Sequence, residues 1–262
     1  MFTALLNIFD HFGEMTLFTL RTLQGVLQGA GRDTFLNICI AVGADSVGVV
    51  MVTGAFIGMV LAEQSYAQFH SLGMQNTLGS IINASVVREL GPVLAGVMLA
   101  GRVGCAMAAE LATMKVTEQV DALACLGVDP VRYLAAPRFA ACVLLIPLLT
   151  IIANFMGVLG GAFVCIHIYH VEAHYYWINS QGHIGIWDLV TGLIKPTFFG
   201  AAIAVIACQR GLTSEPGAQG VGRAATRSFV ASFVVIIILD FFLAVLLNNL
   251  QGYLWPHTRG LS

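Results

Sequence analysis

Residues 139–166 read FAACVLLIPLLTIIANFMGVLGGAFVCI and contain no charged side chain. A helix needs about 20 mostly apolar residues to cross the hydrocarbon core of a bilayer. This stretch is long enough, so it predicts a membrane-spanning helix. Pro147 is expected to kink that helix, because a proline inside a helix removes one backbone hydrogen bond.

Four further stretches satisfy the same length requirement, at about 38–62, 86–110, 187–208 and 229–250. Charged residues make up only 10% of the chain and hydrophobic residues 58%, whereas soluble domains carry about 25% charged residues. A net charge of −2 gives no indication of a nucleic-acid partner. The sequence therefore predicts an all-α polytopic membrane protein, in which residues 34–262 form a membrane domain of about five transmembrane helices.

Residues 1–33 precede the first predicted span and have a different pattern. Apolar residues recur at roughly helical spacing, while Asp10, Glu14 and Arg21 lie among them. Such charges do not fit the short apolar core of a secretory signal. The segment is therefore expected to be a helix that lies in the membrane interface. Its apolar positions are Phe2, Leu5, Leu6, Phe9, Phe12, Leu17, Leu20 and Leu23.

Basic residues are concentrated in alternate connections between the predicted spans. By the positive-inside rule, connections rich in Lys and Arg face the cytoplasm. This rule places the N-terminus and the loops 111–138 and 209–228 in the cytoplasm, and the C-terminus on the opposite, periplasmic side. The basic residues on the predicted cytoplasmic side are Arg21, Arg32, Lys115, Arg132, Arg138, Arg210, Arg223 and Arg227.

The loop after the second span contains the segment 109–123, which reads AELATMKVTEQVDAL. Its apolar residues form a rough stripe, and Glu118 and Asp121 lie one helical turn apart. Gly127 and Asp129-Pro130 are residues that commonly end a helix, so the segment is expected to stop before them. The pattern predicts a short amphipathic helix in the cytoplasm. Two uses remain open for it, docking into a groove of a partner protein or resting on the lipid surface.

Several ionisable residues lie within the predicted spans, where an unpaired charge is costly. Arg88 and Glu89 lie near the outer edge of the second span. They are expected either to face a cavity or pair with each other, or to anchor the helix at the interface as a charge pair. Arg102 and Asp240 are expected to pair across the second and fifth spans.

Two patterns of small residues, Gly54-x-x-x-Gly58 and Gly157-x-x-x-Gly161, would let helix backbones approach closely. Dimerisation through these glycines is one interpretation. Chance spacing among 28 glycines is the other.

Motifs for catalysis or cofactor binding are missing from the sequence. A Walker A loop needs Gly-x4-Gly-Lys-Ser/Thr, but the nearest approach, from Gly217 to Gly222, is followed by Arg223 and Ala224. Three histidines in the second outer loop would share one helix face and could hold zinc, although neighbouring aromatic residues favour plain interfacial histidines. We therefore expect a subunit that is not an enzyme and has no metal or cofactor of its own. The three histidines are His167, His170 and His174.

The central part of the chain resembles the MlaE (YrbE) permease family. The similarity extends over about 45–245 and is strongest around the second span and the loop that follows it. The matching runs are Arg88-Glu89-Leu90-Gly91-Pro92-Val93, Ala100-Gly101-Arg102-Val103-Gly104, Met114-Lys115-Val116-Thr117-Glu118-Gln119, Val128-Asp129-Pro130 and Leu239-Asp240-Phe241.

That resemblance implies a homodimeric permease of an ABC transporter in the inner membrane. Such a permease moves phospholipid or related lipids between that membrane and the periplasmic or outer-membrane side, and so bears on outer-membrane lipid asymmetry. The resemblance also implies a cytoplasmic ATPase that holds the ATP and Mg²⁺, a periplasmic MCE-domain protein and often a small STAS-domain subunit.

The resemblance further implies roles for individual residues. The segment 109–123 would be the coupling helix that meets the ATPase. Arg88 and Glu89 would lie beside the lipid cavity, with Phe56, Met59 and Tyr66 on its apolar wall. Glu63 departs from the family, which often has an apolar residue at that position. The residues expected to face the ATPase are Glu110, Met114, Lys115, Thr117, Glu118 and Asp121.

An ion-coupled secondary carrier is the alternative function, with Glu89, Arg102 and Asp240 handling the ion. Such a carrier would work without an ATPase. The sequence shows no internal repeat of the kind many carriers have. Together with the cytoplasmic amphipathic segment, this favours the ABC permease.

Overall fold

A computed structural model describes residues 2–28, 32–71, 77–183 and 185–254 of the chain. The described residues fold into helices joined by short turns, and five of the helical stretches are long and apolar enough to cross a membrane. The prediction of an all-α protein with five spans is confirmed. Each span extends beyond its predicted ends, because helices continue past the apolar core into more polar turns. The five spans are Phe35–Ser71, Leu78–Val116, Val131–Ile168, Ile186–Leu212 and Ala218–Tyr253.

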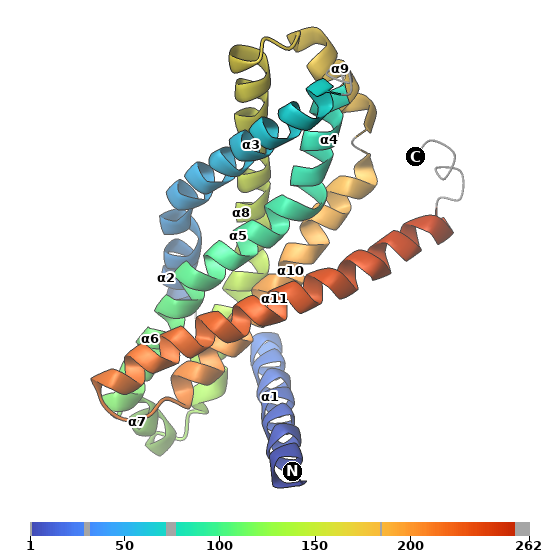
Figure 1. The fold of residues 1–262 in the computed structure, drawn as a ribbon. Coiled ribbons are helices and arrows are strands. Elements are labelled where there is room, and N and C mark those ends of the chain that lie inside the picture. Colours follow the sequence, from blue (N-terminus) through green and yellow to red (C-terminus); the bar gives the residue numbers. More distant parts are fainter. Residues whose placement is uncertain (1, 29–31, 72–76, 184, 255–262) are drawn as a thin grey trace. The chain divides into compact units, whose positions relative to one another are not determined.

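Helical segments follow one another along the whole described chain (Figure 1). Five of them are single π turns that interrupt or extend longer α-helices. A π turn contains one more residue per turn than an α-helix, and such turns are frequent at functional sites. The α-helices are α1 (Phe2–Gln28), α2 (Arg32–Cys39), α3 (Asp45–Ser71), α4 (Leu78–Ser85), α5 (Gly91–Leu99), α6 (Cys105–Val116), α7 (Gln119–Cys125), α8 (Ala136–Phe163), α9 (Ala173–His183), α10 (Ile186–Leu212) and α11 (Ala218–Leu254). The π turns are η1 (Ile40–Ala44), η3 (Val86–Leu90), η4 (Ala100–Gly104), η5 (Val131–Ala135) and η6 (Val164–Ile168).

The chain divides into two compact units, each built from three segments. Unit 1 contains Met1–Ala44, Leu99–Leu145 and Gly200–Val235. Unit 2 contains Asp45–Met98, Ile146–Phe199 and Ile236–Ser262. Helices α8, α10 and α11 continue without a break from one unit into the other.

Unit 1 includes the N-terminal helix, which was predicted from its apolar spacing. The last part of α1 packs on η5, and Thr22 of α1 is buried. A Cβ added at Gly25 would lie only 2.9 Å from the Cβ of Ala136, so this contact needs a glycine. The helix is thus confirmed, and its location in the membrane interface stays a prediction. Apolar side chains fill the space between α6, η5 and α10: Leu111, Leu134, Ala135 and Cys208, with Phe18, Met114 and Leu212 beside them.

In unit 2, helices α3 and α8 approach each other through glycines. A Cβ at Gly54 would lie 2.5 Å from the carbonyl oxygen of Ala153, and one at Gly58 would lie 1.8 Å from that of Gly157. The small-residue patterns therefore serve packing within the chain. Contacts this close explain why neither helix carries a larger residue there.

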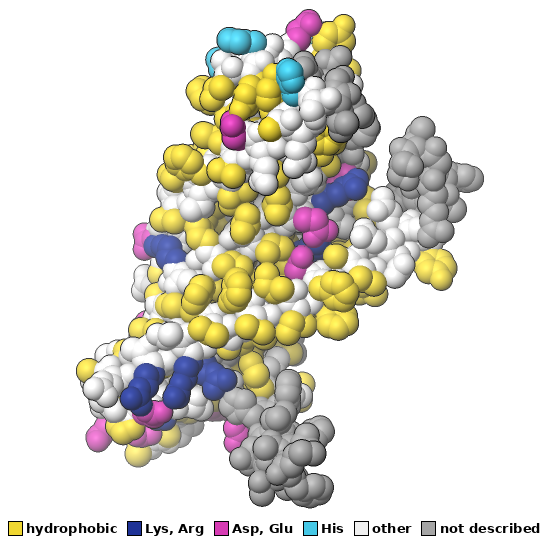
Figure 2. Space-filling model, viewed as in Figure 1, with side chains coloured by type: hydrophobic (Ala, Val, Ile, Leu, Met, Phe, Trp, Pro, Cys, Tyr) yellow, Lys and Arg dark blue, Asp and Glu magenta, His cyan; other side chains and the backbone are white. Residues whose placement is uncertain are grey.

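The spans expose large apolar side chains that a water-soluble protein would bury. On α3 the exposed fractions of Val52, Phe56 and Val60 are 57%, 60% and 62%, and on α11 Phe241 and Phe242 are each 64% exposed. Figure 2 shows apolar side chains over much of the visible surface, with few charges between them. Exposed apolar area on this scale indicates lipid or protein neighbours.

Candidate functional site

The π turn η3 carries two charged residues of the second span, Arg88 and Glu89, and leads directly into α5. Gly91 begins α5 at a point where the side-chain amide of Asn154 packs against the backbone. A Cβ at Gly91 would lie 1.7 Å from Oδ1 of Asn154, so a larger residue would push α8 away from η3.

Arg88 pairs with the start of α10. Its Nε lies 2.6 Å from Oδ1 of Asp188, and the Asp188 side chain is only 3% exposed. Asp188 is held in turn, because its Oδ2 accepts a hydrogen bond from the backbone N–H of Gly185 at 2.8 Å. The Arg88 side chain remains 47% exposed, which leaves its terminal nitrogens accessible.

Lys195 of α10 joins three helices through two ion pairs. Its Nζ pairs with Oε2 of Glu89 on η3 and lies 3.0 Å from Oδ1 of Asp240 on α11. The Lys195 side chain is 2% exposed, whereas that of Glu89 is 47% exposed. A buried ammonium in a membrane span needs such partners, because an isolated charge there is strongly unfavourable.

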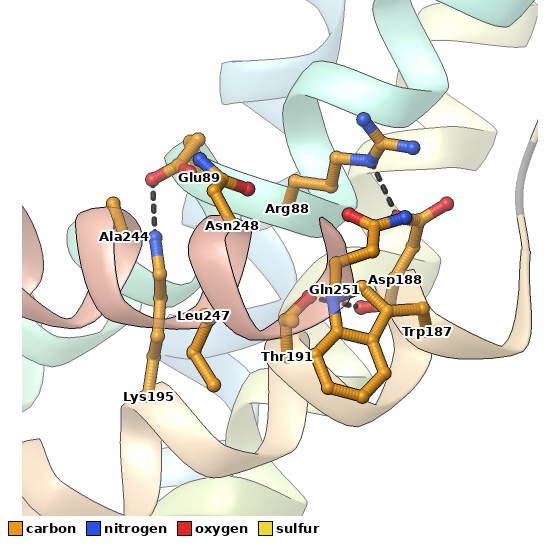
Figure 3. A pocket seen from close by; sticks show the side chains of 10 residues that line it. All are labelled: Arg88, Glu89, Trp187, Asp188, Thr191, Lys195, Ala244, Leu247, Asn248 and Gln251. Atoms are coloured by element: carbon orange, nitrogen blue, oxygen red, sulfur yellow. Dashed lines mark hydrogen bonds and ion pairs between the residues drawn. The ribbon is translucent and has the colours of Figure 1, made fainter. Parts of the chain in front are cut away.

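These residues line a small, partly open pocket in unit 2 (Figure 3). Charged and amide side chains line it together with apolar ones. The indole Nε1 of Trp187 in its wall is buried and has no hydrogen-bond partner among the described residues. The pocket is lined by Arg88, Glu89, Trp187, Asp188, Thr191, Lys195, Ala244, Leu247, Asn248 and Gln251.

The structure changes the predicted pairing of the intramembrane charges. Arg88 and Glu89 do not pair with each other, since their partners are Asp188 and Lys195 on α10. Asp240 was expected to pair with Arg102, and its partner is Lys195 instead. Arg102 donates a hydrogen bond to the backbone oxygen of Ala41.

Two members of the site, Asp188 and Lys195, were missed because neither was assigned a partner from sequence. A signal for them exists, since two opposite charges seven residues apart share one face of a helix. When two charges lie on one face of a membrane-spanning helix, they need oppositely charged or polar partners on neighbouring helices. Sequence spacing alone does not say which elements those are.

The residues predicted for the apolar wall of the cavity lie apart from this pocket. Phe56 is exposed on α3, whereas Met59 and Tyr66 pack against the core of unit 2, which includes Ala62 and Leu78. None of the three is among the residues that line the pocket. Phe56 therefore remains a candidate for lipid contact, and the other two mainly pack the core.

Glu63, the departure from the family pattern, accepts a hydrogen bond from the hydroxyl of Tyr169. This bond raises the pKa of Tyr169 to about 12, because losing the proton would leave two negative groups side by side. The Tyr169 ring stacks on Tyr66, with ring centroids 3.7 Å apart. Glu63 thus fastens the end of α3 to the turn after η6.

The segment predicted as a single helix over 109–123 is two helices. α6 ends at Val116 and α7 begins at Gln119, with Glu118 between them in the left-handed region at φ 60°. The prediction of a single helix is therefore wrong. The spacing of the apolar residues did not indicate the break at Glu118. α7 has no buried residue, and Leu126 just beyond it is 78% exposed.

The six predicted coupling residues divide between anchored and exposed positions, all within unit 1. Glu110 lies 2.8 Å from Arg138, and Lys115 donates a hydrogen bond to the backbone oxygen of Ser214. Met114 packs on the core, and Thr117 donates a hydrogen bond to the backbone oxygen of Thr113. Glu110, Thr117, Glu118 and Asp121 are exposed, the first two in spite of these contacts.

A second group of charges holds the turn between α10 and α11. Glu215 lies 2.8 Å from Arg223 and 3.2 Å from Arg227, and Gly217 takes the positive φ of 89° that the turn requires. Hydrogen bonding to Arg223 lowers the pKa of Glu215. This turn is adjacent to the α6–α7 segment through the bond from Lys115 to Ser214.

The three histidines do not share a helix face. His167 lies in η6, His170 lies in the following turn with φ 54°, and His174 lies in α9. No cluster of three His, Cys, Asp or Glu side chains within the described ranges could hold a metal ion.

The spans and the ion-paired pocket within them define a multi-pass membrane protein with a polar site inside apolar helices. A sequence profile described as Permease MlaE matches residues 35–246, and the chain belongs to this family of ABC transporter permeases. A probable ABC transporter permease protein of Rickettsia typhi is 43% identical over 206 residues, which cover 79% of this chain and 80% of the relative.

Two further relatives have more specific names. The intermembrane phospholipid transport system permease protein MlaE of Haemophilus influenzae is 36% identical over 206 residues, covering 78% of this chain and 79% of the relative. The chloroplastic protein TRIGALACTOSYLDIACYLGLYCEROL 1 of Arabidopsis thaliana is 39% identical over 202 residues, covering 77% of this chain and 58% of the relative.

Proposed function

We propose that this chain is the permease subunit of an ABC transporter that moves phospholipid or related lipids between the inner membrane and the periplasmic or outer-membrane side. The pocket on η3, α10 and α11 carries the proposal, because it places a half-exposed guanidinium inside apolar spans. A guanidinium binds phosphate with charge-assisted hydrogen bonds. The name of the Haemophilus relative supports phospholipid as the cargo class.

In this proposal the ion pairs position the pocket and the apolar helix faces hold the acyl chains. Lys195 fixes Glu89 and Asp240, and Asp188 fixes Arg88, so the polar groups are preorganised before lipid arrives. Exposed apolar side chains such as Phe56 contact the acyl chains. Two copies of the chain form the complete lipid cavity.

A separate cytoplasmic ATPase, which holds the ATP and Mg²⁺, supplies the energy. We assign its docking site to the α6–α7 turn, because α7 has no buried residue and Glu118, Asp121 and the apolar Leu126 are exposed in or beside it. Anchoring by Lys115 and Glu110 lets the turn transmit force instead of bending. A periplasmic MCE-domain protein exchanges the lipid, and a STAS-domain subunit is a further candidate partner.

Charge reversal in the α6–α7 turn tests the ATPase assignment. The double variant Glu118→Lys/Asp121→Lys should weaken ATPase association about tenfold or more, as loss of interface charge pairs does. The measurement is the amount of ATPase that co-purifies with the permease, together with lipid-stimulated hydrolysis. Glu14→Lys, an exposed acidic position on α1, is the matched control and should retain the ATPase. Unaltered assembly in the double variant would contradict the assignment.

Photo-crosslinking tests the lipid site. Arg88→Ala should reduce labelling by a photoreactive phospholipid, because it removes the accessible guanidinium from the pocket. Equal labelling of the variant and the native protein would mean that Arg88 does not bind lipid and only anchors the helix at the membrane interface. Transport at full rate by the chain alone in liposomes, without any ATPase, would support the ion-coupled carrier instead.

A further inference from the structure

We propose that the pocket around Arg88 and Glu89 selects phospholipids whose head group carries a primary ammonium beside the phosphate, as phosphatidylethanolamine does. Anionic phospholipids such as phosphatidylglycerol would bind less well. This inference rests on the proposed function, namely that the pocket receives a lipid head group.

The first observation is that two residues of opposite charge follow one another in the sequence and are both half exposed at the pocket. Arg88 and Glu89 are neighbours in η3, and each side chain is 47% exposed. Each uses one atom for its partner on α10, Nε for Arg88 and Oε2 for Glu89. Figure 3 shows the two charged ends lying apart from each other.

The remaining polar atoms of the pair are available to a ligand. Across the part of the chain that the structure describes, no ion pair or hydrogen bond is recorded for the terminal nitrogens of Arg88 or for Oε1 of Glu89. A phosphate fits the guanidinium, and an ammonium with three N–H donors fits the carboxylate. A zwitterionic head group offers a charged partner to each, whereas a glycerol head group offers Oε1 of the carboxylate only neutral hydroxyl donors.

The second observation is the charge balance of the site. Three carboxylates, on Glu89, Asp188 and Asp240, surround two cations, on Arg88 and Lys195. If all are ionised, the group carries a net charge of −1 within the membrane spans. An excess charge in a low-dielectric region is unfavourable, and a zwitterionic head group, which has no net charge, does not add to it. An anionic head group without an amine adds to the excess.

The third observation concerns hydrogen-bond donors that await an acceptor. The indole Nε1 of Trp187 in the pocket wall is buried without a partner among the described residues. The amides of Asn248 and Gln251 line the same pocket. Phosphate and ester oxygens of a phospholipid are acceptors of the kind these donors need.

Competition between two lipids tests the selection. The full-length permease, purified with its ATPase, is placed in nanodiscs that contain equal amounts of phosphatidylethanolamine and phosphatidylglycerol. The lipid retained after transfer to detergent is then measured by mass spectrometry. Phosphatidylethanolamine should be enriched about tenfold over the nanodisc ratio, the factor expected for one charge-assisted hydrogen bond.

Variants identify the groups responsible. Glu89→Gln should bring the retained ratio close to that of the nanodisc, because it removes the charged partner of the ammonium and so lowers the retention of phosphatidylethanolamine. Arg88→Gln should lower the retention of both lipids, because both carry a phosphate. Glu215→Gln is the matched control, since this carboxylate is 49% exposed but belongs to unit 1 and does not line the pocket. It should keep the native ratio.

The outcomes separate the two proposals. Retention of both lipids by the native protein at the nanodisc ratio overturns the selection and leaves the proposed function standing. Failure of the native protein to retain any phospholipid overturns the proposed function itself. Neither result depends on the folding of a variant.

Discussion

Lys195 shows how much a single residue decides in an apolar environment. Its side chain is 2% exposed, and its ammonium lies between Glu89 and Asp240. A buried cation between two carboxylates is stable only as a set, because removing one member leaves the others uncompensated. The residue therefore positions the pocket even though it offers little surface to a ligand.

Replacement of this lysine should destabilise the protein. Lys195→Met should lower the free energy of unfolding by about 3 kcal/mol, the low end of the range for broken buried pairs, since Glu89 is half exposed. The triple variant Glu89→Gln/Lys195→Met/Asp240→Asn should recover most of that loss, because no charge remains unpaired. Thermal unfolding in detergent, followed by tryptophan fluorescence, measures both. A single variant as stable as the native protein would contradict this role.

At the scale of elements, glycines and π turns set how the helices meet. The glycines of α3 remove the side chains that would hold α8 away, and η3 inserts an extra residue where the site begins. The turn between α6 and α7 depends on Glu118, a non-glycine residue at positive φ. Such a residue is unusual in that region and marks a turn that its surroundings hold in place.

Two glycines of the same helix should respond in opposite ways to alanine. Gly58→Ala should destabilise the protein, because the new Cβ would lie 1.8 Å from the backbone oxygen of Gly157. Gly48→Ala should stabilise it by about 0.5–1 kcal/mol, because a Cβ there meets nothing within 4 Å and alanine favours the helix. Fluorescence-detected size exclusion after heating compares the two. Equal behaviour would mean that α3 and α8 do not pack through Gly58.

At the scale of the whole molecule, the basic loops predict the orientation in the membrane. The native Cys125 is exposed at the end of α7, on the side that the positive-inside rule places in the cytoplasm. The predicted periplasmic side offers His174, exposed on α9. The two positions are therefore suitable reporters for the two faces.

An impermeant maleimide should label Cys125 only after spheroplasts are opened. In the Cys125→Ser background, His174→Cys should be labelled in closed spheroplasts. Cys142, Cys165 and Cys208 are buried and should contribute little in either state. Labelling of Cys125 from outside would invert the predicted topology.

The number of spans was predictable because lipid demands long apolar helices, and the charge-free stretch 139–166 already met that demand. The presence of a polar site in the second span was predictable for the same reason, since Arg88 and Glu89 stand out against apolar neighbours. Spacing along one helix does not encode which helix faces it. The pairing expected between Arg102 and Asp240 was therefore wrong, and the partners of Arg88 and Glu89 on α10 were not predicted.

Composition and the length of the apolar stretches were enough to define a five-span membrane protein, and the motif runs that include Arg88 and Lys115 carried its family resemblance. Only the tertiary structure joined Asp188 and Lys195 to the site and divided the cytoplasmic segment at Glu118. The physical reason is the range of the interactions. Partition into lipid depends on local composition, whereas pairing of buried charges depends on contacts between residues such as Glu89 and Lys195, which lie 106 positions apart.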